Sequence, residues 1–217
     1  MMKTSGMIIG FLLITSNASA VTALGLDNDG VPSYQQTEND PCVIGQPSCK
    51  QPDGFTFTNI SGLDNDGTIT LAEGTSPTYT VGQITTLLGT TAFSIGIDTN
   101  QATQTGITLT DFQVSVGGNL LYDFTADTEI NLINGNGFSD AVLTGVDFTG
   151  LASNLEVVFK AAYTGATDGP ETFFLISATA TPCTSNCFPT VPEPSALILL
   201  GVGLLALPAV MRFRPSK

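Results

Sequence analysis

Residues 107–116 read Ile-Thr-Leu-Thr-Asp-Phe-Gln-Val-Ser-Val, and apolar side chains recur there at every second position. A period of two is typical of a β-strand with one buried face. At Asp111 the alternation shifts by one residue, which predicts a β-bulge. Residues 117–119 (Gly-Gly-Asn) then form a turn signal before a second apolar stretch at 120–124. The whole segment predicts an antiparallel hairpin.

The same period extends to other parts of the chain. Residues 55–60 and 155–163 alternate apolar and polar side chains. Residues 171–177 form an apolar run suited to a strand buried on both faces or to a covered edge strand. Helical spacing occurs only briefly, at 81–88. Asn-Gly and Asp-Gly turns separate these runs at short intervals. The sequence predicts an all-β fold, an antiparallel β-sandwich or jelly-roll-like domain over residues 55–180.

The N-terminus has the pattern of a secretory signal peptide. Lys3 is followed by an apolar run at 7–14 and then by Ala18-Ser19-Ala20. A basic start, a short apolar stretch and an A-x-A ending predict a signal peptide over 1–20, cleaved after Ala20.

The C-terminus combines three features in order. Residues 191–195 read Val-Pro-Glu-Pro-Ser, and residues 196–211 carry no charge. Arg212, Arg214 and Lys217 close the chain. An apolar helix of this length approaches the thickness of a bilayer, and the basic tip places the preceding domain outside the cytoplasm. We therefore expect one C-terminal transmembrane helix.

Pro-Glu-Pro, an apolar helix and a basic tip at the C-terminus resemble the PEP-CTERM sorting signal of Gram-negative bacteria. The resemblance implies export, transient anchoring in the inner membrane, and processing by an exosortase-type enzyme. It also implies delivery to the cell surface or to an extracellular matrix rich in exopolysaccharide, as in biofilms. The sorting motif would comprise Pro192, Glu193 and Pro194, with Arg212 and Arg214 as the stop-transfer tip. Residues 93–101 and 134–140 also resemble stretches of other exported PEP-CTERM proteins.

Between these ends lie a loop-rich N-terminal arm at 21–54, the β domain at 55–180 and a linker at 181–190. In an oxidising compartment, an even number of cysteines predicts disulfides. Four cysteines permit three pairings, and short spacing favours local bridges within the pairs Cys42 and Cys49, and Cys183 and Cys187. A thiolate metal site is the weaker alternative, because the chain has no histidine and no C-x2-C pair.

Charge and composition exclude several function classes. The chain has nineteen acidic and six basic residues, no histidine and no tryptophan. The lack of histidine removes imidazole-based nucleophilic catalysis and histidine metal ligands. The excess of negative charge disfavours nucleic-acid binding. All acidic residues except Glu193 lie between the two terminal signals, and that segment has only two basic residues, both lysines. An anionic polymer could therefore bind this segment only through bridging cations.

The hexamer Gly-Leu-Asp-Asn-Asp-Gly occurs twice, at 25–30 and at 62–67. In the second copy, Asp64, Asp66 and Glu73 fall at positions 3, 5 and 12 of a calcium-loop pattern, although its first aspartate is replaced by glycine. The alternative is ordinary turn chemistry, in which Asn-Asp-Gly supplies side-chain hydrogen bonds and a positive φ. Calcium is thus a possible cofactor.

The sequence is compatible with three functions. The first is a non-catalytic structural or adhesive protein of the cell envelope or matrix. The second is a calcium-dependent carbohydrate-binding module, although the chain lacks tryptophan as a sugar platform. The third is an exported hydrolase that uses paired carboxylates. Because the segment between the signals has no arginine or histidine, we expect the first function and no enzymatic activity.

Overall fold

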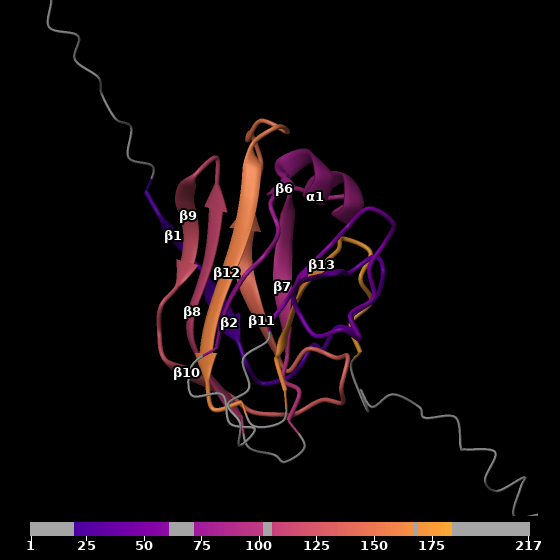
Figure 1. Cartoon of the computed structure of the whole chain (residues 1–217), viewed down its shortest axis with the longest axis vertical. Coiled ribbons are helices and arrows are strands. Elements are labelled where there is room, and N and C mark those ends of the chain that lie inside the picture. The colour runs from indigo at the N-terminus through magenta and orange to yellow at the C-terminus, as the bar shows by residue number, and fades with distance from the viewer. Residues whose placement is uncertain (1–19, 61–71, 102–105, 167–168, 184–217) are drawn as a thin grey trace, which may run out of the picture.

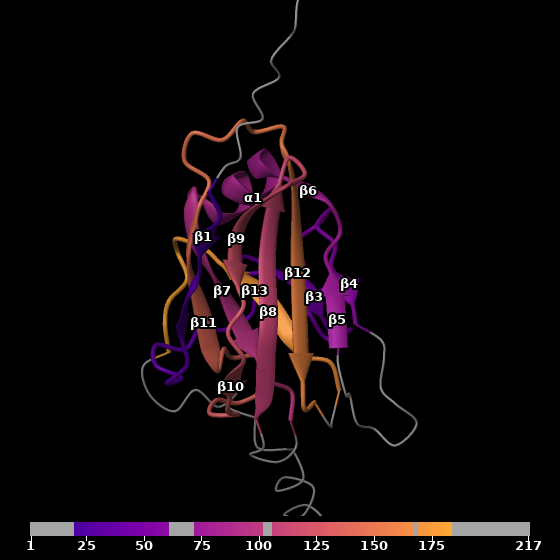
Figure 2. The same cartoon turned by 90° about the vertical axis from the view of Figure 1, so that its left-hand side faces the viewer.

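The computed structural model describes residues 20–60, 72–101, 106–166 and 169–183. These residues form two mixed β-sheets in two layers, with one short helix at one end (Figures 1 and 2). Sheet A contains, in spatial order, β1 (Thr22–Ala23), β9 (Asn119–Phe124), β8 (Ile107–Val116), β12 (Glu156–Thr164) and β5 (Ala72–Thr75), with β10 (Thr128–Ile130) paired to β8 and β6 (Tyr79–Thr80) to β12. Sheet B contains β2 (Gly25–Asp27), β11 (Ala141–Asp147), β7 (Ala92–Asp98), β13 (Thr172–Ile176), β3 (Cys42–Gly45) and β4 (Thr58–Asn59).

Eight strands make up the centre of the two sheets, and all of their pairings are antiparallel. Sheet B has the order β11-β7-β13-β3, and sheet A has the order β9-β8-β12-β5. Along the chain, successive members of this set change sheets at every step except between β8 and β9, which form a hairpin. Connections therefore cross from one layer to the other throughout the domain.

The hairpin predicted from residues 107–124 is present. Gly117 and Gly118 have φ values of 58° and 78° and form the turn between β8 and β9. The pairing of β8 with β12 shifts register at Asp111, because Asp111 is opposite Ala162 while Leu109 is opposite Tyr163. The phase slip in the sequence thus corresponds to a bulge in the strand.

Aromatic side chains join the two layers. Phe112 of β8 stacks on Phe173 of β13, with ring centroids 5.5 Å apart, and Tyr163 of β12 lies 5.9 Å from the same ring. All three side chains are fully buried. Such contacts bury large apolar area, which is the main favourable term in folding. The core between the sheets therefore depends on the apolar face of each alternating strand.

The predicted helix is α1 (Val81–Leu88). Thr80 and Gln83 form a capping box at its start, and Gly89 ends it in the left-handed conformation at φ 68°. Val81, Ile84 and Leu88 are buried against the core. The helix closes one end of the domain, and β7 runs away from it towards the opposite end (Figure 1).

The structure differs from a purely antiparallel sandwich at its margins. β1 pairs with β9 and β3 pairs with β4 in parallel. Parallel neighbours require a long connection, and the arm supplies one between β3 and β4. The segment 21–54, expected to be loop-rich, also contributes β1, β2 and β3 to the two sheets.

The arm covers the outer face of sheet B, where Phe174 and Ile176 form a second apolar cluster with Cys42. Tyr34 and Cys49 pack onto this cluster from the arm. A strand with side chains buried on both faces reads as a continuous apolar run, which explains the sequence of β13.

Gly96 of β7 has no room for a side chain. It lies opposite Phe174, and a Cβ built on Gly96 would lie 2.4 Å from the phenyl ring. Replacing it with alanine should destabilise the domain by about 1–3 kcal/mol through overpacking. Urea denaturation would measure the loss, and Gly118→Ala is a useful comparison because a Cβ there meets no atom within 4 Å and its cost comes from the positive φ. Equal stability of Gly96→Ala and the parent chain would contradict this packing argument.

Among the described residues, no helix is long and apolar enough to cross a membrane. The helix expected at 196–211 and the signal peptide expected at 1–20, apart from Ala20, lie outside those residues.

Candidate functional site

Three acidic side chains gather at the end of the domain opposite α1. Asp98 ends β7, Asp140 precedes β11 and Glu171 precedes β13. Asp98 is 2% exposed, and the other two are fully buried. We call these three residues the acid cluster. Asp98 and Asp140 belong to the stretches 93–101 and 134–140, which resemble stretches of other exported PEP-CTERM proteins. The acid cluster brings these two stretches together.

Asp140 is saturated by hydrogen bonds. One carboxylate oxygen accepts from the backbone N–H groups of Ile133 and Asn134, at 2.8 and 2.6 Å. The other accepts from the backbone N–H and the hydroxyl of Thr99, at 2.9 and 2.5 Å. Asp140 therefore ties the loop after β7 to the loop before β11, and its role is structural.

Glu171 holds the loop after β7 in a similar way. Its two oxygens accept from the backbone N–H of Asn100 and from the side-chain amide of Gln101. Its own N–H donates to the hydroxyl of the buried Tyr163 at 2.9 Å. In the sequence, Glu171 is only the first residue of the apolar run at 171–177. Nothing in that run predicts that its carboxylate binds the loop after β7.

Asp98 is different, because one of its oxygens is unused. Oδ2 accepts from the backbone N–H of Gly137 at 2.8 Å, whereas Oδ1 is buried without a hydrogen-bond partner among the described residues. Thr172, which lies directly opposite Asp98 in the pairing of β7 with β13, has a buried hydroxyl that also lacks a partner there. Two unsatisfied oxygens thus face the same side of sheet B.

Burial raises the pKa values of all three acids. The pKa of Asp98 rises to about 7, chiefly through desolvation and further through the charge of Asp140. The pKa of Glu171 rises to about 8, again chiefly through desolvation, with added repulsion from Asp98 and Asp140. Desolvation also raises the pKa of Asp140, against the opposing effect of its hydrogen bonds. No lysine or arginine contributes to these three shifts within the described residues.

A cleft of about 270 Å³ opens beside Asp98, between the arm and the loop before β11. Its polar lining comprises Gln35, Gln36, Gln46, Ser48, Lys50, Asp98, Asn136 and Thr172. Gln36 joins the two sides of the arm, because its amide donates to the carbonyl of Lys50 at 2.7 Å and its oxygen accepts from the N–H of Lys50 at 3.0 Å. These two hydrogen bonds fix the shape of the cleft on the side of the arm.

The residues predicted for calcium are only partly described. Glu73 is exposed on β5, while Asp64 and Asp66 lie outside the described residues. In the first hexamer, residues 25–27 form β2, Asp29 accepts from the N–H of Val31 at 3.0 Å, and Gly30 has a φ of 73°. That copy serves as a strand end and a turn.

The Asn134–Asp140 stretch also uses its polar groups internally. The Asn134 side-chain amide donates to the carbonyls of Gly30 and Ser139, at 3.0 and 2.8 Å. Within the described part of the chain, no three His, Cys, Asp or Glu side chains are grouped so that they could hold a metal ion.

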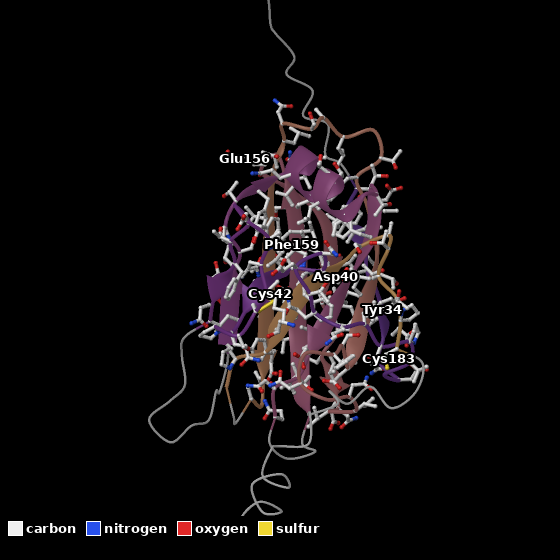
Figure 3. All side chains as sticks on the ribbon, turned by 90° about the vertical axis from the view of Figure 1, so that its right-hand side faces the viewer. Tyr34, Asp40, Cys42, Glu156, Phe159 and Cys183 are labelled. Carbon is white, nitrogen blue, oxygen red and sulfur yellow. A yellow bond between two sulfur atoms is a disulfide. The ribbon has the colours of Figure 1, made fainter. Side chains whose placement is uncertain are left out.

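The disulfide between Cys42 and Cys49 is present and lies within the arm. Cys183 is also disulfide-bonded, and its backbone pairs with Ser33 of the arm (Figure 3). Its expected partner, Cys187, lies outside the described residues. At the predicted signal cleavage site, Ala20 is exposed and Ala18 is outside the described residues.

Comparison with known proteins identifies the C-terminus. The family described as the PEP-CTERM protein-sorting motif matches residues 190–214, which include Pro192, Glu193, Pro194, Arg212 and Arg214. No curated protein and no solved structure matches the chain. The chain therefore carries a PEP-CTERM protein-sorting motif, which implies export, membrane-associated sorting and processing by an exosortase-type enzyme.

Proposed function

We propose that this chain is a non-catalytic exported protein, delivered by its sorting signal to the cell surface or extracellular matrix. There the β domain acts as a structural or adhesive component associated with exopolysaccharide or biofilm. The sorting motif at 190–214 is the observation that carries this proposal. The acidic surface supports it, because a strongly charged domain stays soluble at high local concentration.

The domain that is delivered is, on this proposal, a jelly roll. The orders β11-β7-β13-β3 and β9-β8-β12-β5 are those of eight strands that alternate between two sheets as two Greek keys. Such domains present loops at both ends of a rigid core, and loops on a rigid scaffold are suited to binding. The absence of histidine and arginine between the two terminal signals supports a binding or structural role over catalysis.

The sorting signal can be tested in the producing bacterium. Replacing Pro192, Glu193 and Pro194 by alanine should leave an unprocessed, membrane-bound form that retains its C-terminus. Cell fractionation and mass spectrometry of the protein would show this. Replacing the linker residues Thr184, Ser185 and Asn186 by alanine is the matched control, and it should leave processing unchanged. Arrival of the motif variant at the surface with the normal mature mass would refute the assignment.

A second candidate is a calcium-dependent carbohydrate-binding module. The amide-rich cleft beside Asp98 favours it, because amide groups can donate to and accept from sugar hydroxyls. Retention on the organism's own exopolysaccharide in calcium, and release by EDTA, would support this function. Loss of retention in Asp64→Ala with Asp66→Ala would place the calcium dependence in the second hexamer.

A further inference from the structure

We propose that the cleft beside the acid cluster binds a divalent cation of the calcium type, held by Asp98 Oδ1 and Thr172 Oγ1. This site is distinct from the hexamer at 62–67 and goes beyond the sorting function. It rests on two unsatisfied oxygens, on the local charge, and on the ligands that the cleft supplies.

Asp98 Oδ1 and Thr172 Oγ1 are buried without a hydrogen-bond partner among the described residues. Asp98 and Thr172 are each 2% exposed, and they lie opposite one another at the edge of the cleft. Buried polar atoms are almost always satisfied, so two such atoms on neighbouring strands indicate a missing partner. The Thr172 hydroxyl does not donate to Asp98 in the structure, and because both oxygens carry free lone pairs, one cation can bind both atoms.

The charge around Asp98 also favours a cation. The acid cluster brings three carboxyl groups together, and each of Asp98 and Asp140 repels Glu171. Once these acids are ionised, above about pH 8, a water molecule in the cleft would satisfy the two oxygens but would leave this repulsion in place. A cation satisfies the oxygens and offsets the charge. Lys50 lines the same cleft but is exposed, and it is not among the groups that shift the pKa of Asp98.

The available ligands favour a hard cation that binds uncharged amide and hydroxyl oxygens as well as carboxylates. Asp140 and Glu171 already use their oxygens for backbone and amide donors, so Asp98 is the carboxylate available to the ion. Gln46 and Asn136 bring side-chain amides to the same cleft. Gln46 Oε1 accepts a long hydrogen bond of 3.3 Å from the side-chain amide of Asn100, and Asn136 uses its NH₂ group to donate to Asn100. Calcium is bound by carboxylate, amide and hydroxyl oxygens together with water, and sites with few charges have dissociation constants of about 10⁻⁴–10⁻³ M. A weak site of this kind suits an exported protein.

Calcium alone is the probe for the test. The full chain is stripped with EDTA and titrated with CaCl₂, with MgCl₂ in parallel, while calorimetry and thermal unfolding are followed. We expect a rise of several degrees in Tm at about 10 mM calcium. Asp98→Asn should weaken calcium binding at least about tenfold. Asp127→Asn, which removes an exposed carboxylate, should bind calcium like the parent chain.

Thr172→Val separates cation binding from folding. Because the Thr172 hydroxyl has no partner among the described residues, this substitution should leave the calcium-free Tm unchanged or slightly higher. It should nevertheless weaken calcium binding several-fold. This variant tests the site independently of any change in folding caused by Asp98→Asn.

Three outcomes would overturn the proposal. Calcium could leave the Tm of the parent chain unchanged, or its effect could persist undiminished in both Asp98→Asn and Thr172→Val. The effect could also disappear in Asp64→Asn with Asp66→Asn while Asp98→Asn binds normally, which would place the ion in the second hexamer. Because purified protein is used, none of these results bears on sorting by the C-terminal signal.

Discussion

The unfolding free energy of the full chain in EDTA should fall as the pH rises from about 5 to about 8. Burial raises the pKa of Asp98 from 3.8 to about 7 and that of Glu171 from 4.5 to about 8. Between the ordinary and the raised values, the folded chain holds protons that the unfolded chain has released. Stability therefore decreases with pH in that window, and the penalty is complete above about pH 8.

The size of this effect makes it easy to measure. One pKa unit corresponds to about 1.4 kcal/mol, so the two shifts together predict a loss of several kcal/mol. Urea denaturation at a series of pH values would give the slope. Asp98→Asn combined with Glu171→Gln should flatten it. Asp127→Asn with Glu129→Gln is a control of equal charge change at exposed positions. Stability that rises between pH 5 and 8 would contradict the burial of these acids.

Asp140→Asn should destabilise the domain by about 2–4 kcal/mol. The two oxygens of Asp140 accept four hydrogen bonds from Thr99, Ile133 and Asn134, and the residue is fully buried. In the asparagine variant, an NH₂ group replaces one of the two carboxylate oxygens, and two of these donors point at that position. Those donors lose their acceptor, and the two loops that Asp140 joins lose their connection.

The matched variant is Asp98→Asn, because it makes the same chemical change in the same cluster. Asp98 Oδ2 accepts one hydrogen bond, from Gly137, which an amide oxygen can also accept. Removing its charge relieves repulsion with Glu171. In EDTA near pH 8, Asp98→Asn should therefore be as stable as the parent chain or more stable. If urea denaturation gave both variants the same loss, the different roles assigned to the two aspartates would be wrong.

Sequence patterns located β8, β9, β12 and β13, because each pattern reports a local physical requirement, whereas core strands such as β7 and β11 were not predicted. The alternation at 107–116 gave β8 and its bulge, and the helical spacing at 81–88 gave α1. The run at 55–60 was less informative, because β4 covers only Thr58–Asn59. The candidate site was harder to predict. Thr172 has no local signature, and its importance depends on Asp98, which lies opposite it on β7.

The sequence by itself determined the all-β class, the β8–β9 hairpin and the sorting signal at the C-terminus. Each of these is encoded by neighbouring residues, through strand periodicity, turn chemistry or a contiguous motif. Only the tertiary structure decided the strand order, the covering of sheet B by the arm, and the meeting of Asp98, Asp140 and Glu171. These features arise from contacts between residues far apart in the chain, which are selected by burial of the shared core and leave no pattern in a local stretch of sequence.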